Sequence, residues 1–303
     1  MARAFPPDVV VLDTDSLVHA RLAPGKANPQ IVQAKNYRLA ADTFTPAVVT
    51  PELANEASLA EGLRRLKMET GKWQRVSVLL PDSWFRINIV DLPSLPDRAN
   101  EAMEVVRWSL KRTLPIPPDT LRLAYSVLSK TPAGVKLLVL SAVEKTLTAI
   151  EKVFAAAGLE AILIEPIGLN IWNAVAVREA LPNNGQANDR LFLYVREREF
   201  TTAVFRGEQP LFIRSRNLAG ERTLEQEIRL SATYLRDNLG TETIEQCYVA
   251  GSVIGGADVA GVLAEEFSAP VRTLQLRDFT EQTPSDVYGI DAELTACTGV
   301  FTG

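Results

Sequence analysis

The sequence predicts an α/β fold composed of two similarly organised halves. Residues 9–39 and 191–214 each contain three short strands joined by turns, and each set is followed by helices with one apolar face. The stretch 182–188, Pro-Asn-Asn-Gly-Gln-Ala-Asn, has the composition of a linker, so we place the boundary between the halves there. The chain has 303 residues, of which 47% are hydrophobic, which is enough for two domains of ordinary size.

The composition argues against several classes of function. The formal net charge is −5, whereas a protein whose main partner is nucleic acid needs concentrated Lys and Arg. His19 is the single histidine of the sequence, so neither a His-based zinc site nor a Ser-His-Asp triad is expected. Cys247 and Cys297 lie in apolar contexts, and we interpret both as buried reduced thiols.

The sequence gives no sign of a segment that enters a membrane. It has no run of about 18 apolar residues, and its N-terminus lacks the apolar core of a signal peptide. We therefore expect a cytoplasmic protein that reaches a membrane only through its partners.

The first half begins with a series of strands and a helix. Apolar runs predict strands at 9–13, 17–22 and 30–39. A helix is expected to begin at a capping box of Ser58 and Glu61, because side chains at this spacing can each satisfy a backbone amide of the first turn.

The segment 76–142 has the most regular pattern of the chain. Alternating apolar residues predict a hairpin whose strands lie at 76–80 and 85–89. Two Leu-Pro pairs then stop the second strand, and Asp97 stands where the N-cap of a helix that extends to about Thr113 is expected.

A second hairpin follows the helix, with strands at 121–127 and 135–142, and a further helix at 144–157 is closed by Gly158. Hairpin, helix and hairpin together make a compact module of about 80 residues. The module carries no pattern of catalytic residues. It therefore indicates a protein that positions other proteins.

The second half repeats the plan of the first. Thr223 and Gln226 have the spacing of a capping box for its first helix. The other expected elements are strands at 191–195, 200–205, 211–214, 246–251 and 271–274 and helices at 258–267 and 292–300. Two halves of this kind are typical of the duplicated architecture of actin and the sugar kinases.

The run from Leu79 to Leu128 contains motifs that together resemble a known family. They are the Leu-Pro-x-Leu-Pro entry at 92–96, Trp108 near the end of the helix, the Leu-Pro-Ile-Pro exit at 114–117 and Tyr125 in the next strand. This combination resembles PilM, a family of type IV pilus assembly proteins that is actin-like and related to the cell-division protein FtsA.

Two further segments extend the resemblance: 205–215 is similar to the second set of strands in the family, and 249–263 is similar to its Gly-rich, adenosine-contacting segment. The resemblance implies an actin-like (ribonuclease H-like) two-domain fold. The first half would cover 1–185 and contain an inserted subdomain at about 73–160. The second half would cover 186–303, and its last helix would pack back on the first half.

The resemblance also implies where a nucleotide would bind. Actin-like proteins hold ATP between their halves, and each half offers the phosphates a tight turn, usually Asp-x-Gly. In the first turn Asp15 stands where glycine is expected, which adds negative charge beside a phosphate unless Mg²⁺ offsets it. The candidate cofactor-binding residues are Asp13, Asp15, Ser16, Gly251, Ser252 and Gly255.

The second turn departs further from the pattern. Tyr194 and Arg196 occupy the positions of its Asp and Gly, and Arg198, Glu199 and Phe200 replace small residues. Either arginine could hold a phosphate, but a solvated charged turn is the simpler interpretation. We therefore expect a degenerate ATP site with no catalytic residue and no metal centre, and leave binding of ATP and Mg²⁺ open.

The resemblance implies a non-catalytic scaffold of the inner-membrane platform that serves pilus biogenesis and twitching motility. In the family, the N-terminal tail of the membrane protein PilN lies in a groove between the first core subdomain and the inserted one. Candidate partner-binding residues are Trp84, Phe85 and Trp108, although aromatic side chains also serve as core. Pilus motor ATPases and further copies of the chain are additional candidate partners.

Two alternatives stay open from the sequence. An active ATPase of the actin superfamily should have Asp-x-Gly at both turns, and neither turn has it. The cytoplasmic part of the type II secretion protein GspL would share the fold, but that protein continues into a membrane span. The sequence shows no span before Gly303, although a fragment would escape this argument.

Overall fold

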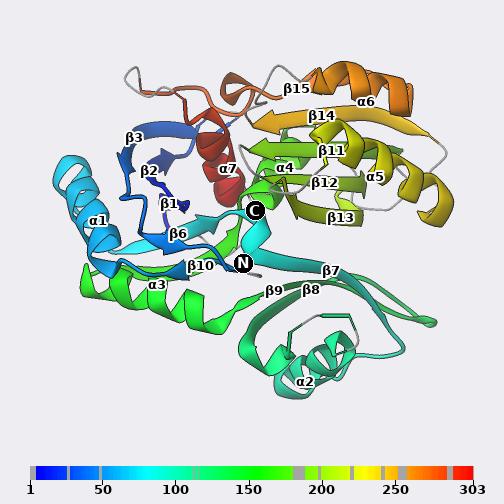
Figure 1. The fold of residues 1–303 in the computed structure, drawn as a ribbon, viewed down its shortest axis with the longest axis horizontal. Helices are drawn as coiled ribbons and strands as arrows, with labels where there is room; N and C mark the ends of the chain where they lie inside the picture. The colour runs from blue at the N-terminus through cyan, green and yellow to red at the C-terminus, as the bar shows by residue number, and fades with distance from the viewer. Residues whose placement is uncertain are drawn as a thin grey trace.

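The fold consists of two α/β lobes and a smaller sheet that projects from the first lobe (Figure 1). The computed structural model describes residues 5–25, 28–47, 50–111, 113–114, 116–179, 188–196, 199–218, 222–239, 243–251, 258–284 and 289–302. The expected linker therefore lies largely outside the described residues.

The first lobe is built on a five-stranded sheet in the order β10-β6-β1-β2-β3. Its central strand β1 is buried at every position, as expected of a strand covered on both faces. Strands β2 and β3 continue from β1 as an antiparallel meander, whereas β6 and β10 run parallel to it. The strands are β1 (Asp8–Leu12), β2 (Ser16–Ala23), β3 (Gln30–Arg38), β6 (Arg75–Leu80) and β10 (Glu160–Pro166).

Alternate residues of β1 serve two different cores. Val10 and Leu12 face a core shared with helices α1 (Glu56–Thr70) and α3 (Glu144–Ala156). Val9 and Val11 face the other side, where α4 (Ile167–Arg178) and α7 (Asp291–Thr302) lie between the lobes. This alternation follows from the two-residue period of a strand. A two-stranded ribbon of β4 (Phe44–Thr45) and β5 (Glu52–Leu53) completes the lobe.

The second lobe repeats this topology, with the order β13-β12-β11-β14-β15. Its first three strands are antiparallel and its last two run parallel to the first, as in the first lobe. The elements are β11 (Asp189–Arg196), β12 (Glu199–Arg206), β13 (Gln209–Asn217), β14 (Ile244–Gly251), β15 (Val271–Thr273), α5 (Leu224–Leu239) and α6 (Val259–Phe267). The equal strand order shows that the fold is internally duplicated, as the sequence predicts.

The projecting sheet has the order β7-β9-β8 and carries one helix, α2. Its core includes Val106 and Leu110 of the helix and Val139 of the sheet. The elements are β7 (Phe85–Leu92), α2 (Ala99–Leu110), β8 (Leu121–Thr131) and β9 (Gly134–Val143). Because β6 belongs to the first sheet and α3 packs on the first lobe, this subdomain spans a shorter range than the expected 73–160.

One of the two predicted hairpins is wrong. β8 and β9 pair as predicted, but β6 and β7 do not pair with each other and belong to different sheets. The segment Asp82–Trp84 between them forms a 3₁₀ turn that redirects the chain. Pro81-Asp82-Ser83 is therefore a junction between two sheets and not a hairpin turn.

Two predicted helix caps also need correction. Asn55 caps α1, because its side chain accepts a hydrogen bond from the amide of Ser58, which lies inside the helix. Arg98 occupies the N-cap position of α2, one residue after Asp97. The capping box of Thr223 and Gln226 before α5 is present in both directions.

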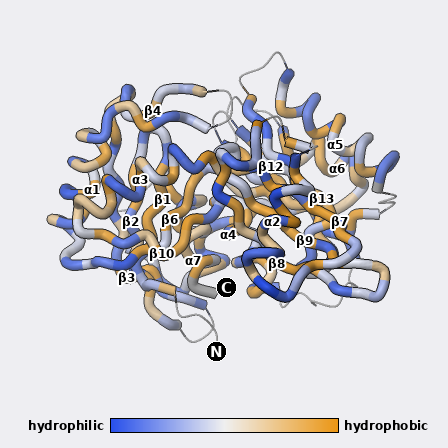
Figure 2. The backbone as a smooth tube through the Cα atoms, turned by 90° about the horizontal axis from the view of Figure 1, so that it is seen from below, coloured by the Kyte–Doolittle hydropathy of each residue, from blue (hydrophilic) through white to orange (hydrophobic). Residues whose placement is uncertain are grey.

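The two lobes share a core formed around α4 and α7. In Figure 2 these helices and the central strands carry the hydrophobic colour, whereas the periphery is largely polar. The helices approach closely at Gly299, where a Cβ atom would lie 1.7 Å from the carbonyl oxygen of Asn170. The contact requires glycine at this position because neither backbone can move without opening the shared core.

Replacement of Gly299 should therefore destabilise the whole molecule. We expect Gly299→Ala to lower the free energy of unfolding by about 2 kcal/mol or more, the range of overpacked cores. Urea unfolding followed by circular dichroism measures the change. Thr233→Ala, on the exposed part of α5, is the control and should change stability by less than about 0.5 kcal/mol. Equal stability of Gly299→Ala and the wild type would contradict this account of the α4–α7 contact.

Candidate functional site

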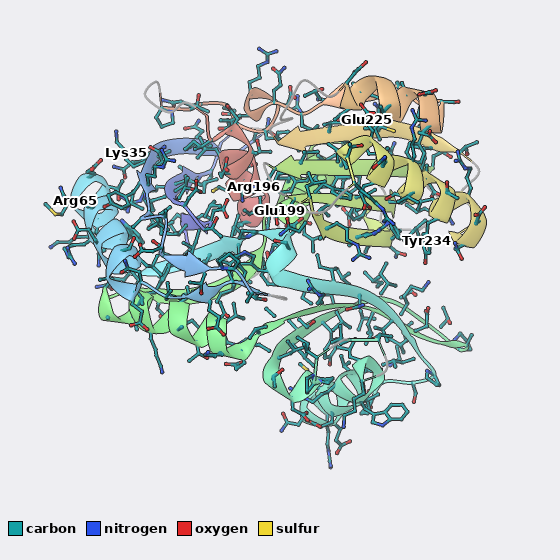
Figure 3. All side chains as sticks on the ribbon, in the orientation of Figure 1. Lys35, Arg65, Arg196, Glu199, Glu225 and Tyr234 are labelled. Carbon is teal, nitrogen blue, oxygen red and sulfur yellow. The ribbon has the colours of Figure 1, made fainter. Side chains whose placement is uncertain are left out.

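The turn between β1 and β2 faces the end of β11 across the junction of the lobes. Asp13 of this turn forms an ion pair with Arg196 of β11, and Arg196 forms a second one with Glu293 of α7, at 3.3 Å. All three side chains are largely buried. Figure 3 shows Arg196 and Glu199 near the centre of the molecule, between the two lobes. A single guanidinium thus connects three elements at the place where the duplicated turns meet.

Asp82 makes a second polar connection between the lobes. Its carboxylate accepts a hydrogen bond from the amide of Gly168 at the start of α4, at 2.7 Å. It accepts another from the hydroxyl of Thr201 on β12, also at 2.7 Å. Burial raises the pKa of Asp82 to about 6, although both hydrogen bonds oppose this shift.

Glu199, at the start of β12, lies in the same buried cluster. Burial raises the pKa of its carboxyl to about 7, against a hydrogen bond from Ser83. Burial also raises the pKa of Glu293 above its ordinary value. The charge of Arg196 opposes both shifts, so this guanidinium partly offsets the negative charge of the acids at the junction.

The residues predicted for the first phosphate turn do form a tight turn. The amide of Asp13 donates to the carbonyl of Ser16 at 2.9 Å, and the amide of Leu39 donates to the carbonyl of Asp15 at 2.8 Å. The side chain of Asp13 accepts from the amide of Thr14. The Asp13 carboxylate is therefore held toward Arg196 by its own turn.

The third predicted element is described only in part. Gly251 ends β14 with a φ of 92°, and a Cβ atom there would lie 1.9 Å from the carbonyl of Val195. Glycine is thus required by the close approach of β11. Ser252 and Gly255 lie outside the described residues, as does Arg198 of the second turn.

The three predicted partner-binding aromatics have different surroundings. Trp84 and Phe85 are only 3% and 4% exposed and belong to the core of the first lobe. Their burial corrects the expectation that they form a partner surface. Trp108 is 70% exposed on α2 and borders a hollow of about 350 Å³. The structure does not bring these three residues together.

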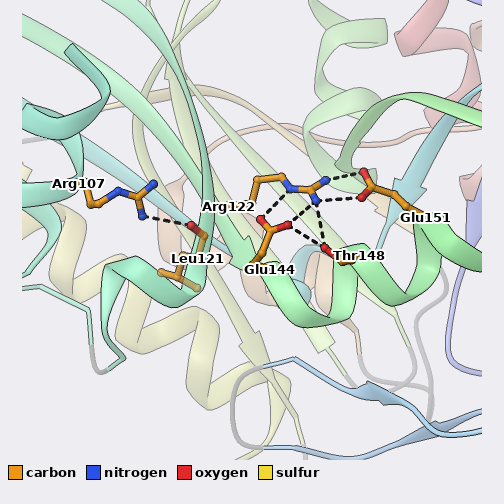
Figure 4. Close-up of polar contacts among 6 residues, drawn as sticks. All are labelled: Arg107, Leu121, Arg122, Glu144, Thr148 and Glu151. Atoms are coloured by element: carbon orange, nitrogen blue, oxygen red, sulfur yellow. Dashed lines mark hydrogen bonds and ion pairs between the residues drawn. The ribbon is translucent and has the colours of Figure 1, made fainter. Parts of the chain in front are cut away.

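The inserted sheet is fastened to the first lobe by Arg122 on β8 (Figure 4). Its guanidinium donates to Glu144, at 2.7 Å and 3.0 Å, and to Glu151, both on α3. Hydrogen bonds from Arg122 lower the pKa of Glu144 below its ordinary value. Paired fork contacts of this kind fix orientation as well as distance.

A hollow of about 580 Å³ lies beside this fastening. It is lined by α3, the turn after it and the first residues of β6 and β10, including Glu151, Ala155 and Leu159. Glu151 therefore contributes both to the hollow and to the contact with the inserted sheet.

Sequence reasoning missed the roles of Asp82, Thr201 and Glu293. Asp82 lies in a Pro-Asp-Ser sequence that is also common in hairpin turns, and its burial gave no local signal. The described residues contain no group of three or more His, Cys, Asp or Glu side chains that could hold a metal ion. Among the helices of the same residues, none has both the length and the hydrophobicity of a membrane span.

The raised pKa of Asp82 should be visible in the pH dependence of stability. Between its ordinary pKa, about 4, and the folded value of about 6, the folded protein binds more protons than the unfolded chain. The contribution of Asp82 to the free energy of unfolding therefore falls as pH rises through this window, by on the order of 2 kcal/mol. We expect Asp82→Asn to reduce this decline.

Urea unfolding at about pH 4.5 and pH 7.5 tests this expectation. Asp91→Asn, which removes a carboxylate whose side chain is 75% exposed, is the matched control. The residual decline in Asp82→Asn should come from Glu199 and Glu293, whose pKa values are also raised. A decline as large in Asp82→Asn as in the wild type and the control would show that Asp82 is not responsible.

Comparison with solved structures identifies proteins with a similar fold. No protein-family model and no curated protein sequence matches the chain. Among solved structures, a chain of the PilM–PilN type IV pilus biogenesis complex is similar with a TM-score of 0.79 and 17% identity, over 98% of each chain.

Two further structures are similar at lower scores. A protein from Bacteroides thetaiotaomicron with an actin-like ATPase fold and unknown function has a TM-score of 0.56 and 13% identity, over 98% of each chain. The cytoplasmic domain of EpsL, an inner-membrane component of the type II secretion system of Vibrio cholerae, has a TM-score of 0.53 and 10% identity, over 98% of this chain and 94% of that one. The predicted fold is thus confirmed: the chain has an actin-like, PilM-like fold.

Proposed function

We propose that the protein is a non-catalytic scaffold of a type IV pilus assembly platform, located in the cytoplasm at the inner membrane and bound there to the N-terminal tail of a PilN-like protein. The observation that carries this proposal is the pairing of Arg196 with Asp13 and Glu293. These ion pairs join the β1–β2 turn and α7 to the end of β11 at the junction of the lobes.

The pairing works against a catalytic nucleotide site. Mg²⁺ on the carboxylate oxygen of Asp13 that contacts Arg196 would have to displace this guanidinium, which adds a cost to metal binding. If Arg196 instead turned to a phosphate, Asp13 and Glu293 would lose their cation beside an added negative charge. Asp15 increases this repulsion, because it stands in the same turn.

The hollow along α3 is the site that best fits the N-terminal tail of a PilN-like protein. It lies on the first lobe, and Glu151 on its border is held by Arg122 of the inserted sheet. An extended tail could therefore contact the first lobe beside the point where the insertion is fastened. Ala155 is exposed there above the buried Leu159, and Arg75 and Glu160 at the edge supply charges of both signs.

A second candidate function is a component of a type II secretion system. The likeness to the cytoplasmic domain of EpsL supports this alternative, since both proteins would then serve an inner-membrane platform. The higher TM-score and coverage of the PilM–PilN structure favour the pilus. Motor ATPases and further copies of this chain remain additional candidate partners.

The proposed tail site can be blocked without touching the core. Ala155 is exposed on the border of the hollow, so Ala155→Trp should fill the hollow while the fold stays intact. We expect this variant to bind a PilN-type N-terminal peptide at least about tenfold more weakly than the wild type in isothermal titration calorimetry, as hot-spot changes do.

The control is Ala133→Trp, in the exposed turn between β8 and β9. It adds the same side chain far from the hollow and should leave the affinity unchanged. If Ala155→Trp and Ala133→Trp bind alike, the tail lies elsewhere. If the wild type does not bind the peptide at high micromolar concentration, the scaffold proposal itself fails.

The nucleotide expectation is tested by a separate titration. Because Arg196 and Asp13 satisfy each other, we expect no binding of ATP at micromolar concentrations in the presence of Mg²⁺. Calorimetry with the wild-type protein measures this directly. Micromolar affinity, or ATP hydrolysis that Asp13→Asn abolishes, would show that the junction opens for a nucleotide and would favour the ATPase alternative.

A further inference from the structure

A group of arginines lies where the inserted sheet approaches the second lobe. β7 is an edge strand of the inserted sheet and β13 an edge strand of the second sheet, and they lie side by side (Figure 1). Arg86 extends from β7, and Arg214 and Arg216 extend from β13. We call these three residues the arginine cluster.

The positive charge of the arginine cluster is only partly neutralised. Glu227 on α5 pairs with Arg214 at 3.3 Å, but it also pairs with Arg222 at 3.5 Å. Arg86 donates to the carbonyls of Ser83 and Phe85, which carry no charge. Within the described residues, the buried Nε of Arg214 has no hydrogen-bond partner. Among the described residues, Glu227 is thus shared by Arg214 and Arg222, and no ion pair is found for Arg86 or Arg216.

The pKa values of two of the three arginines, Arg86 and Arg214, are lowered, as expected for partly buried, neighbouring positive charges. Burial, and then the charge of Arg216, lowers the pKa of Arg86. The same two causes lower the pKa of Arg214, against the attraction of Glu227. Concentrated positive charge stands out in a chain whose net charge is −5. Such repulsion lowers the stability of the folded state unless an anion relieves it.

Apolar side chains adjoin the arginine cluster on the same face. Phe212 shares its face of β13 with Arg214, because alternate residues of a strand point the same way. Its ring packs against Tyr234 of α5, with ring centroids 5.3 Å apart. Tyr234 is 45% exposed and Leu230, one helical turn earlier, is 41% exposed.

We propose that this face, the arginine cluster together with Leu230 and Tyr234, binds an acidic amphipathic segment of a partner protein. Carboxylates of the segment would pair with Arg86 and Arg216, and its apolar residues would cover Leu230 and Tyr234. The face lies on the second lobe and β7, whereas the tail site proposed above lies along α3. The inference therefore stands independently of the proposed function.

The chemistry of the face favours a peptide over other anions. A phosphate or a nucleic-acid backbone would satisfy the guanidinium groups but leave the two exposed apolar side chains uncovered. The overall net charge of −5 also repels long polyanions. A segment with both Glu and Leu side chains complements each part of the face.

A fluorescence anisotropy titration tests the proposal on the full chain. The probe is a labelled helical peptide with a leucine stripe and, beside it on the same side of the helix, a stripe of glutamates. We expect the wild type to bind it with an affinity that falls as salt is raised, because the pairing charges are partly exposed. Arg86→Gln/Arg216→Gln should bind at least about tenfold more weakly, since two charged hydrogen-bond groups are lost.

Two controls make the result specific. Arg64→Gln/Arg65→Gln removes the same charge from exposed positions on α1 and should bind like the wild type. Tyr234→Ser leaves the charges intact and should also weaken binding if apolar residues contribute. Thermal unfolding checks that each variant folds, and Arg216→Gln alone, at an exposed position, serves if the double variant does not.

Several results would overturn the proposal. They are absence of peptide binding by the wild type, equal affinities of the cluster variant and the α1 control, and no effect of Tyr234→Ser. Inorganic pyrophosphate and vesicles that contain anionic lipid are tested in parallel. If either binds through the arginine cluster more tightly than the peptide, the face recognises a phosphate group, and the assignment to a protein partner is wrong.

Discussion

The relative position of the two lobes depends on the ion pairs of Arg196 with Asp13 and Glu293. The apolar core around α4 and α7 provides most of the adhesion between the lobes, but hydrophobic contact is non-directional. A buried charge is different, because it is costly unless its partners are at hydrogen-bonding distance. Arg196 therefore selects one arrangement of the β1–β2 turn, β11 and α7. Asp82 adds a second constraint of the same kind between α4 and β12.

The same ion pairs explain how a duplicated fold can change its use. When two equivalent turns bind one anion, both must attract it, so neither can carry a strong negative charge without a metal ion. Here the first turn is acidic, with Asp13 and Asp15, and the second offers Arg196. Turns of opposite charge attract each other and not a shared ligand. In the function that we propose, the junction is an internal interface, and partners are recognised on the outer surfaces.

Much of this fold can be predicted from the sequence, because the spacing of apolar residues within short segments indicates strands and helices. All five strands of the second sheet lie close to their expected ranges, and so do β8, β9 and α3. Which strands pair is a different question, since pairing depends on distant residues. The apolar alternation before and after Asp82 is compatible with a hairpin, and only the burial of Asp82 against α4 and β12 shows that the chain passes between sheets.

The candidate site could be predicted less well, for a related reason. Only an exposed side chain can contact a partner, and the sequence does not show which aromatic residues are exposed. Trp84 ends the turn before the inserted sheet and Phe85 begins β7, and both fill the core of the first lobe, whereas Trp108 lies on the exposed face of α2. The ion pairs of Arg196 join residues 13, 196 and 293, a separation that no local pattern reveals.

The inserted sheet shows how charge balance separates structural from recognition surfaces. On the side of the first lobe, Arg122 meets two carboxylates of α3, so its positive charge is paired within the chain. On the side of the second lobe, Arg86 lies near Arg216, and within the described residues the ion pairs of this region are those of Glu227 with Arg214 and Arg222. A protein gains no stability from juxtaposed like charges, and the Arg122 contact shows that this sheet can place acids where its arginines need them. The positive charge on the side of the second lobe is the feature that the proposed acidic segment would neutralise.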